Sequence, residues 1–276
     1  MSLDPAPSPG KSSLRFLEPL AASLWILFLV WSVIVALIWS FRIGEAEIMA
    51  WTTAHFHLPE VPAGGQKSPL QEALISLIPV FDQGWVILAA VNVYAFTAAR
   101  EGLATARKWA FFTLLTVFVV AGFSATRAQP LGPILYTKLL GFKIAGVPYG
   151  LPLFWFAAIV GARGFMLQLS PSIPQYRLAF GAGAMALFLD VALEPVAWKL
   201  RVFWLWYPGR PPTPPWPPMQ NYITWFVVGV ALVALMRETR VLRADTRGLR
   251  SPAGVFMTLF AVLTVANLAR VLHAPR

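Results

Sequence analysis

Two carboxylic acids lie four residues apart in an apolar stretch of the chain. Asp190 and Glu194 belong to residues 178–200, a stretch long and apolar enough to form a transmembrane helix. Residues four apart share one face of a helix, so the two carboxyl groups should be neighbours, with Trp198 on the same stripe. An acid inside a membrane segment costs roughly 2.5 to 3.5 kcal/mol and usually faces a cavity or a partner. This pair is therefore the first candidate for chemistry.

The residue after the second acid should loosen the helix. Pro195 removes the helical hydrogen bond that would reach the carbonyl of Val191, so we expect a kink and a polar pocket there. Neighbouring carboxyl groups in apolar surroundings tend to hold one proton between them. One group can then donate a proton while the other accepts one. Alternatively, the pair only joins helices through Arg or Asn partners, or lies at the membrane interface.

Aromatic and amide side chains follow the acid pair. Trp198, Trp204 and Trp206 could line a cavity and stabilise a cation with their ring faces, or they could form an aromatic belt at the membrane boundary. Asn221 and Trp225 lie one helical turn apart at the start of the next apolar stretch. Asn221 is then either a site residue or simply the cap of that helix.

A further acid, Asp82, lies in an earlier apolar stretch, one turn after Pro79. It either joins the acid pair or is paired structurally with Asn92 or with an arginine. Thiol and histidine-metal chemistry are not expected, because the chain has no cysteine and its three histidines lie outside the apolar stretches, at His55, His57 and His273.

The composition indicates an all-α, polytopic integral membrane protein. The 276 residues are 58% hydrophobic and only 12% charged, which excludes an ordinary soluble domain and a disordered chain. The net charge of +10 could indicate a nucleic-acid partner. However, the Lys and Arg residues lie in short segments between apolar stretches, where they set topology and meet lipid head groups. We therefore expect membrane lipids as partners and no nucleic acid.

Seven apolar stretches are expected to cross the membrane, at about 21–41, 72–98, 109–125, 148–166, 178–200, 221–236 and 254–272. Together they form one helical domain, 21–272, between a flexible N-terminal tail, 1–20, and a C-terminal tail, 273–276. With alternating spans, the slight positive-inside bias assigns the N-terminus to the cytoplasmic side of a bacterial inner membrane.

The connections between these stretches differ in character. Residues 42–71 should be a loop, with a short interfacial helix near 48–56. Residues 126–147 are too rich in glycine and proline for a span, and should pack at the interface or dip in against the protein. Residues 208–218 should be a stiff, polyproline-like connector, because proline fixes φ and removes the backbone donor.

Four short motifs occur in order between residues 129 and 225. They are PLG at 130–132 followed by YTKLLG at 136–141, GVP at 146–148 leading to Pro152 and Trp155, DVALEP at 190–195 leading to WLW at 204–206, and NYITW at 221–225. This ordered set resembles the integral-membrane carotenoid 1,2-hydratases, the CruF-type carotenoid biosynthesis proteins. Members of that family add water across the terminal C1–C2 double bond of an acyclic carotenoid such as lycopene or γ-carotene, without a cofactor.

The resemblance implies a carotenoid within the bilayer as substrate, and the residue types agree with that chemistry. Hydration needs a poorly solvated acid, aromatic faces near a tertiary cation, and a positioned water. We expect Asp190 to be the acid, Glu194 its partner and Asn221 the residue that places the water. The expected substrate-binding residues are aromatic: Tyr136, Trp155, Trp198, Trp204, Trp206 and Trp225.

The chain departs from the family pattern at three positions. Glu194 stands where the family usually has Asp, Ile134 where it has Tyr, and Ala121 where it has a Glu in the third span. The last departure favours an alternative, a carotenoid-binding or otherwise modifying protein of the same fold that does not hydrate. A small proton-coupled carrier is a further alternative, although no inverted repeat is evident. The absence of a lysine for a Schiff base in the last span argues strongly against a retinal protein.

Overall fold

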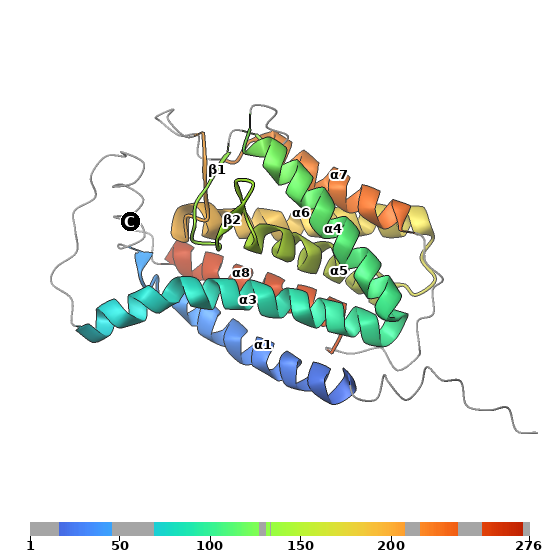
Figure 1. The fold of residues 1–276 in the computed structure, drawn as a ribbon, viewed down its shortest axis with the longest axis horizontal. Coiled ribbons are helices and arrows are strands. Elements are labelled where there is room, and N and C mark those ends of the chain that lie inside the picture. Colours follow the sequence, from blue (N-terminus) through green and yellow to red (C-terminus); the bar gives the residue numbers. More distant parts are fainter. Residues whose placement is uncertain are drawn as a thin grey trace, which may run out of the picture.

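The structure is a computed structural model, which describes residues 17–45, 69–126, 131–132, 134–207, 216–236 and 250–272 (Figure 1). Its helices are α1 (Leu17–Ser40), α3 (Pro69–Glu101), α4 (Leu103–Ser124), α5 (Gly150–Leu169), α6 (Gln175–Glu194), the π-helix η1 (Pro195–Leu200), α7 (Met219–Leu235) and α8 (Pro252–Leu272). Its strands are short: β1 (Ile134–Tyr136), β2 (Lys143–Ile144), β3 (Val147–Pro148) and β4 (Trp204–Trp206).

The prediction of a helical, polytopic membrane protein is confirmed. Within the described ranges, six helical segments are long and apolar enough to cross a membrane, and α7 is a shorter apolar helix of 17 residues. The expected fifth span corresponds to α6 continued by η1, which together cover Gln175–Leu200. The expected interfacial helix near 48–56 and most of the polyproline connector lie outside the described residues.

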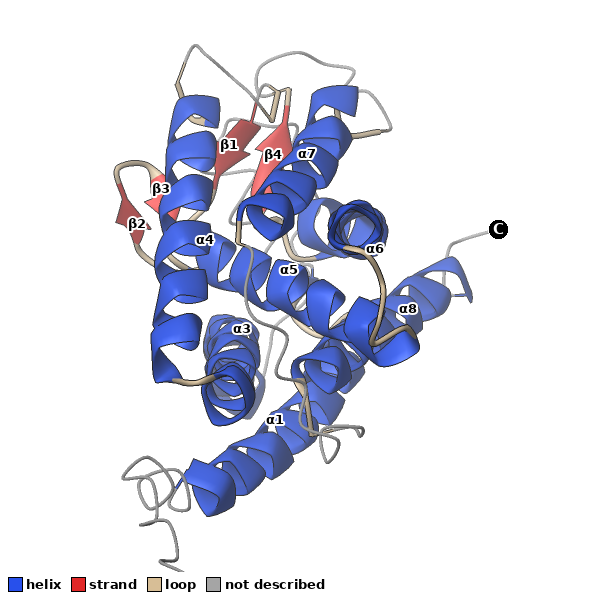
Figure 2. Ribbon diagram, turned by 90° about the vertical axis from the view of Figure 1, so that its right-hand side faces the viewer, coloured by secondary structure: helices blue, strands red, loops and turns tan. Residues whose placement is uncertain are grey.

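The central helix is α5. Its sequence is apolar apart from Arg163 and Gln168, and 78% of its span is buried, the largest share of any candidate span. In Figure 2 it lies among α3, α4, α6 and α8, and it contacts all four. α1 packs on α3 and α8 at one side of α5, and α7 packs along α6 at the other.

Helices α6 and α7 approach closely where two glycines meet. A Cβ on Gly229 would lie 3.0 Å from the Cα of Gly183, and a Cβ on Gly183 would lie 2.6 Å from Val230 Cγ2. Glycine at both positions therefore allows the two backbones to come together. This packing places the start of α7 beside the end of α6, where the two acids lie.

Residues 134–148 contain three short strands joined by turns. β1 pairs antiparallel with β4, with Ile134 opposite Trp206 and Tyr136 opposite Trp204. β2 and β3 form a two-residue antiparallel hairpin. In Figure 2 the β1–β4 pair lies between the ends of α4 and α7. It brings Tyr136 from one motif next to the tryptophans of another.

Candidate active site

Two buried carboxyl groups share one amide donor. Asp190 and Glu194 lie in the last two turns of α6 and are 0% and 2% exposed. Asn221 Nδ2 lies 2.8 Å from Asp190 Oδ2 and 2.8 Å from Glu194 Oε1. An amide nitrogen carries two hydrogens, so it can donate to both acids at once. The spacing of four residues places both carboxyl groups within reach of this amide on α7.

Asn221 is not the cap of its helix. α7 begins at Met219 with Pro218 in the cap position, and the backbone N–H of Asn221 donates to the carbonyl of Pro218 at 2.9 Å. The proline has the fixed φ and the extended ψ that suit the residue before a helix. The Asn221 side chain is thereby free to face α6, and the interpretation as a cap is wrong.

Three donors surround Glu194. Besides Asn221, the indole of Trp206 donates to Glu194 Oε2 at 2.9 Å and that of Trp204 donates to the same oxygen at 3.3 Å. Residues two apart in a strand point to the same side, which is why β4 directs both indoles at one carboxyl group. In contrast, Asp190 Oδ1 has no hydrogen-bond partner among the described residues. The pair is therefore asymmetric.

The tryptophans of β4 do not form a belt at the membrane boundary. Trp204 and Trp206 are only 3% and 1% exposed. The helix does loosen at Pro195, as expected, because the π-helix η1 starts there. A π-turn takes more residues than an α-turn, so Trp198 does not follow the stripe of the two acids. Trp198 is only partly buried and lies beside the Lys199 ammonium, 5.4 Å from the ring centre.

A small cavity adjoins the acid pair. Its free volume of about 10 Å³ is roughly the room that one water molecule needs. Three of its lining residues, Asn221, Trp204 and Trp206, also donate to the carboxyl groups. Tyr136, Trp155 and Trp225 line it as well. The structure thus brings together all the residues expected at the site except Trp198 and Asp82.

The aromatic side of this cavity is tightly packed. Trp155 of α5 and Trp225 of α7 stack with their ring centres 3.7 Å apart. Tyr136 of β1 is 2% exposed. Burial first, and then the charge of Glu194, raise the pKa of the Tyr136 hydroxyl, which therefore stays protonated at neutral pH.

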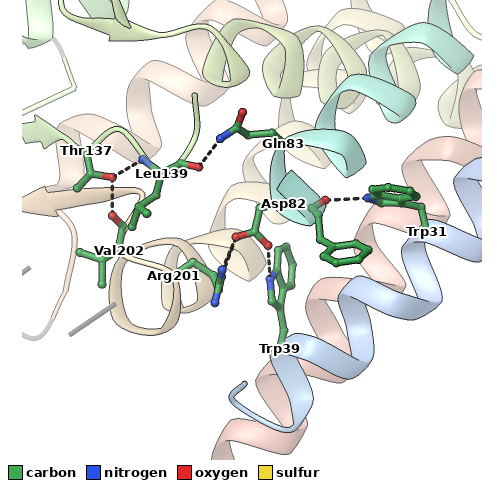
Figure 3. Close-up of polar contacts among 9 residues, drawn as sticks. Trp31, Trp39, Asp82, Gln83, Thr137, Leu139, Arg201 and Val202 are labelled. Carbon is green, nitrogen blue, oxygen red and sulfur yellow. Dashed lines mark hydrogen bonds and ion pairs between the residues drawn. The ribbon is translucent and has the colours of Figure 1, made fainter. Parts of the chain in front are cut away.

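Asp82 belongs to a separate polar cluster. Its Oδ2 accepts from Arg201 Nε at 2.9 Å and from Arg201 Nη2 at 2.5 Å, and its Oδ1 accepts from Trp39 Nε1 at 2.9 Å (Figure 3). Asn92 instead donates to the backbone carbonyls of Leu24 and Leu88. Of the alternatives for Asp82, the structure shows pairing with an arginine.

This cluster fixes the segment that leads into β4. Arg201 directly follows η1, and Val202 after it has a φ of 49°, which is costly for a β-branched residue. Thr137 Oγ1 donates to the carbonyl of Val202 at 2.8 Å, as Figure 3 shows, and lies 3.1 Å from that of Phe203. Contacts from α3 on one side and from the residue after β1 on the other thus hold the chain that carries Trp204 and Trp206.

Sequence reasoning missed Arg201. The signal available was weak: a single basic residue directly after the fifth apolar stretch, and an acid in the second stretch that needed a partner. Many arginines in the chain could have met Asp82. Only the fold shows which one does.

A second, apolar cavity lies next to the first. It is lined by Trp85, Phe154, Leu193 and Phe203, among others, and it shares Leu151 and Trp204 with the first cavity. Across the described ranges, no three His, Cys, Asp or Glu side chains group closely enough to hold a metal ion.

Comparison with known proteins adds one match. A family model described as "Carotenoid biosynthesis protein" matches residues 83–276, which include the acid pair, Asn221 and all the aromatic residues of the cavity. Asp82 and α1 precede the matched part. No curated protein and no solved structure matches the chain.

Proposed function

Because the chain belongs to the carotenoid biosynthesis protein family, we propose that it adds water to the C1–C2 double bond of an acyclic carotenoid end by acid catalysis. The observation that carries the proposal is the buried Asp190–Asn221–Glu194 cluster, in which Asn221 also lines a cavity walled by aromatic rings. This arrangement supplies a proton donor, a proton acceptor and cation-stabilising faces in one place.

The hydrogen bonds support a division of roles within the acid pair. Glu194 accepts from three donors, an environment that suits a carboxylate. Asp190 accepts from Asn221 on Oδ2 only, which leaves Oδ1 to carry a proton. One proton on the pair also avoids two like charges side by side in an apolar site. Asp190 is thus the acid and Glu194 the base.

The reaction then proceeds in two steps. The π electrons of the double bond form a C2–H bond with the proton on Asp190 Oδ1, leaving a tertiary cation at C1. A lone pair of water forms the C1–O bond, and the proton that the water loses passes to Glu194. The product is a tertiary alcohol, and a proton moving from Glu194 to Asp190 restores the pair. No redox cofactor is needed, because the net change is the addition of water.

The aromatic residues stabilise the cation. Trp155, Trp204, Trp206 and Trp225 line the cavity, whose free volume of about 10 Å³ admits a water but not a carotenoid end, so in this proposal these side chains move apart to admit the substrate. A cation over such a ring face gains about 2 kcal/mol when both are shielded from water. The rings also keep bulk water out, so the cation meets a single positioned nucleophile rather than solvent.

The substrate reaches the site from the membrane. A carotenoid lies within the bilayer, where lipids surround the helices, so it can approach the site without passing through water. In this proposal the protein resides in the bacterial inner membrane, with its N-terminus in the cytoplasm. Its partners are the carotenoid and the lipids around it.

The test is pigment analysis of a lycopene-producing bacterial host that expresses the full chain. Chromatography and mass spectrometry should show carotenoids that have gained one or two waters. Asp190→Asn and Glu194→Gln should each abolish that gain. Arg177→Gln, a change at an exposed residue near the other end of α6, should keep it.

The competing function is carotenoid binding or another modification without hydration. The observation in its favour is Ala121, which is buried in α4 and offers no acid where the family resemblance expects one. Unchanged lycopene that copurifies with the membrane-inserted protein would support this alternative and overturn hydration.

A further inference from the structure

Two residues that line the cavity each carry a buried polar atom without a partner. Tyr136 Oη and Trp155 Nε1 have no hydrogen-bond partner among the described residues, although their side chains are only 2% and 1% exposed. Both side chains line the same cavity beside the acid pair. Buried polar groups are seldom left unpaired, because each has given up its hydrogen bonds to water. Two such groups in one cavity indicate that a small polar molecule binds between them.

The size of the cavity limits which molecule can bind there. A free volume of about 10 Å³ suits one water, provided that the site offers two to four polar partners. Trp155 Nε1 can only donate a hydrogen bond, whereas the Tyr136 hydroxyl can donate or accept. Asn221 also lines the cavity, and its Oδ1 remains an acceptor after Nδ2 has donated to the two acids.

Both groups are held in position by the fold. The Trp155 ring stacks on Trp225 at 3.7 Å, and Tyr136 lies opposite Trp204 in the β1–β4 pair. The hydroxyl also keeps its proton, because burial and the charge of Glu194 raise the pKa of Tyr136. The site is therefore preorganised for a neutral, hydroxylic ligand.

We propose that Tyr136 and Trp155 form the binding site of the water that attacks the cation. This inference rests on the proposed function and deepens it, because it assigns the nucleophile a place distinct from the acid. Trp155 Nε1–H donates to the water oxygen, and Tyr136 Oη accepts one of the water hydrogens. One lone pair is left for C1, and the proton released on attack goes to Glu194.

The proposal separates two steps that can be measured independently. Asp190 protonates C2 whether or not water is in place. Without water, the cation at C1 has one simple outcome: the Asp190 carboxylate takes a proton from C2 or from a methyl carbon on C1, and the electron pair of that C–H bond forms an alkene. In D2O such a reversal leaves deuterium in the carotenoid without adding a hydroxyl group.

The experiment uses the full chain in membranes with lycopene in D2O, and mass spectrometry of both hydrated and unhydrated carotenoid. Tyr136→Phe and Trp155→Phe should each lower the hydrated product by about tenfold, the usual effect of one lost hydrogen bond, while the unhydrated carotenoid still gains deuterium. Asp190→Asn should lose both the alcohol and the deuterium. Tyr176→Phe, which removes an exposed hydroxyl on α6, should change neither.

The possible outcomes distinguish the two proposals. If Tyr136→Phe and Trp155→Phe lose the deuterium together with the alcohol, or if they keep the full yield of alcohol, the water site is overturned while hydration stands. If the unaltered protein gives neither alcohol nor deuterium, the proposed function itself fails. Retained deuterium also shows that a variant is folded, since only an intact acid site can introduce it.

Discussion

Arg201 Nη2 lies 2.5 Å from Asp82 Oδ2 in an ion pair whose side chains are both buried. The two residues are 119 positions apart, and Asp82 lies just before the part of the chain that the family model matches. Because Arg201 precedes β4 by only three residues, this ion pair anchors the tryptophans that donate to Glu194. Residues outside the matched part therefore support the site inside it.

Removing one partner of this ion pair should destabilise the protein strongly. Arg201→Met leaves the Asp82 carboxylate buried without its counter-charge, and such changes cost about 3–5 kcal/mol. The double variant Asp82→Leu/Arg201→Met should recover most of that loss, because no charge is then left unpaired. Thermal unfolding in detergent, followed by tryptophan fluorescence, measures both.

The Arg42–Glu45 ion pair provides the control. These two residues also form an ion pair, but they are partly exposed and lie three positions apart just after α1. Arg42→Gln should change stability by only about 0–1 kcal/mol, as is usual for exposed pairs. A double variant as unstable as Arg201→Met would show that the loss comes from packing and not from an unpaired charge.

A methyl group at Gly183 should move the Asn221 amide away from Asp190 and Glu194. A Cβ there would lie 2.6 Å from Val230 Cγ2 and 2.9 Å from the carbonyl oxygen of Phe226, and the backbone oxygen cannot move aside as a side chain can. We expect Gly183→Ala to push α7 away from α6 and to lower hydration by about a hundredfold, the effect of a displacement near 1 Å. Pigment analysis measures the yield.

Gly122 on α4 is the matched control, because a Cβ there would meet nothing within 4 Å. Gly122→Ala should keep the full yield and stabilise its helix by about 0.5–1 kcal/mol. Equal losses of activity in Gly122→Ala and Gly183→Ala would count against the glycine contact as the reason that Asn221 reaches the acids.

Much of the fold could be predicted because the bilayer fixes the length and polarity of its helices. Local rules also located the acid pair and the loosened turn at Pro195, since both depend on residues within one or two turns. The same rules failed for Trp198. They placed it on the helix face of the two acids by assuming α-helical spacing, and a π-turn changes that spacing.

Long-range contacts were beyond such reasoning. Strands of three residues, such as β1 and β4, show no alternation that could predict their pairing. Likewise, nothing near Asp82 indicates Arg201 as its partner. The amide of Asn221 could equally cap its own helix or reach another, and only the Pro218 that precedes α7 and the close approach to α6 decide between the two.

The two tryptophans of β4 should contribute unequally. Trp206 Nε1 lies 2.9 Å from Glu194 Oε2, whereas Trp204 Nε1 lies 3.3 Å from it, beyond the usual range of about 2.7–3.2 Å. Phenylalanine keeps an aromatic ring and removes the donor. Trp206→Phe should therefore lower hydration by about tenfold, and Trp204→Phe by a smaller factor. Initial rates in isolated membranes measure this, and a larger loss with Trp204→Phe would contradict the assignment.

Asn221→Asp should be more harmful than Asn221→Leu, although Asp is closer to Asn in shape. Asp removes both N–H donors and places a third carboxyl group between Asp190 and Glu194, which are buried and 2.8 Å from the amide nitrogen. Leucine removes the donors without adding charge, and leaving buried acceptors unpaired costs about 1–3 kcal/mol. Like charges crowded in an apolar site cost more than that. Thermal unfolding of the two variants, measured side by side, shows which one is less stable. An Asn221→Asp protein as stable as Asn221→Leu would mean that the amide is not the donor that the two acids share.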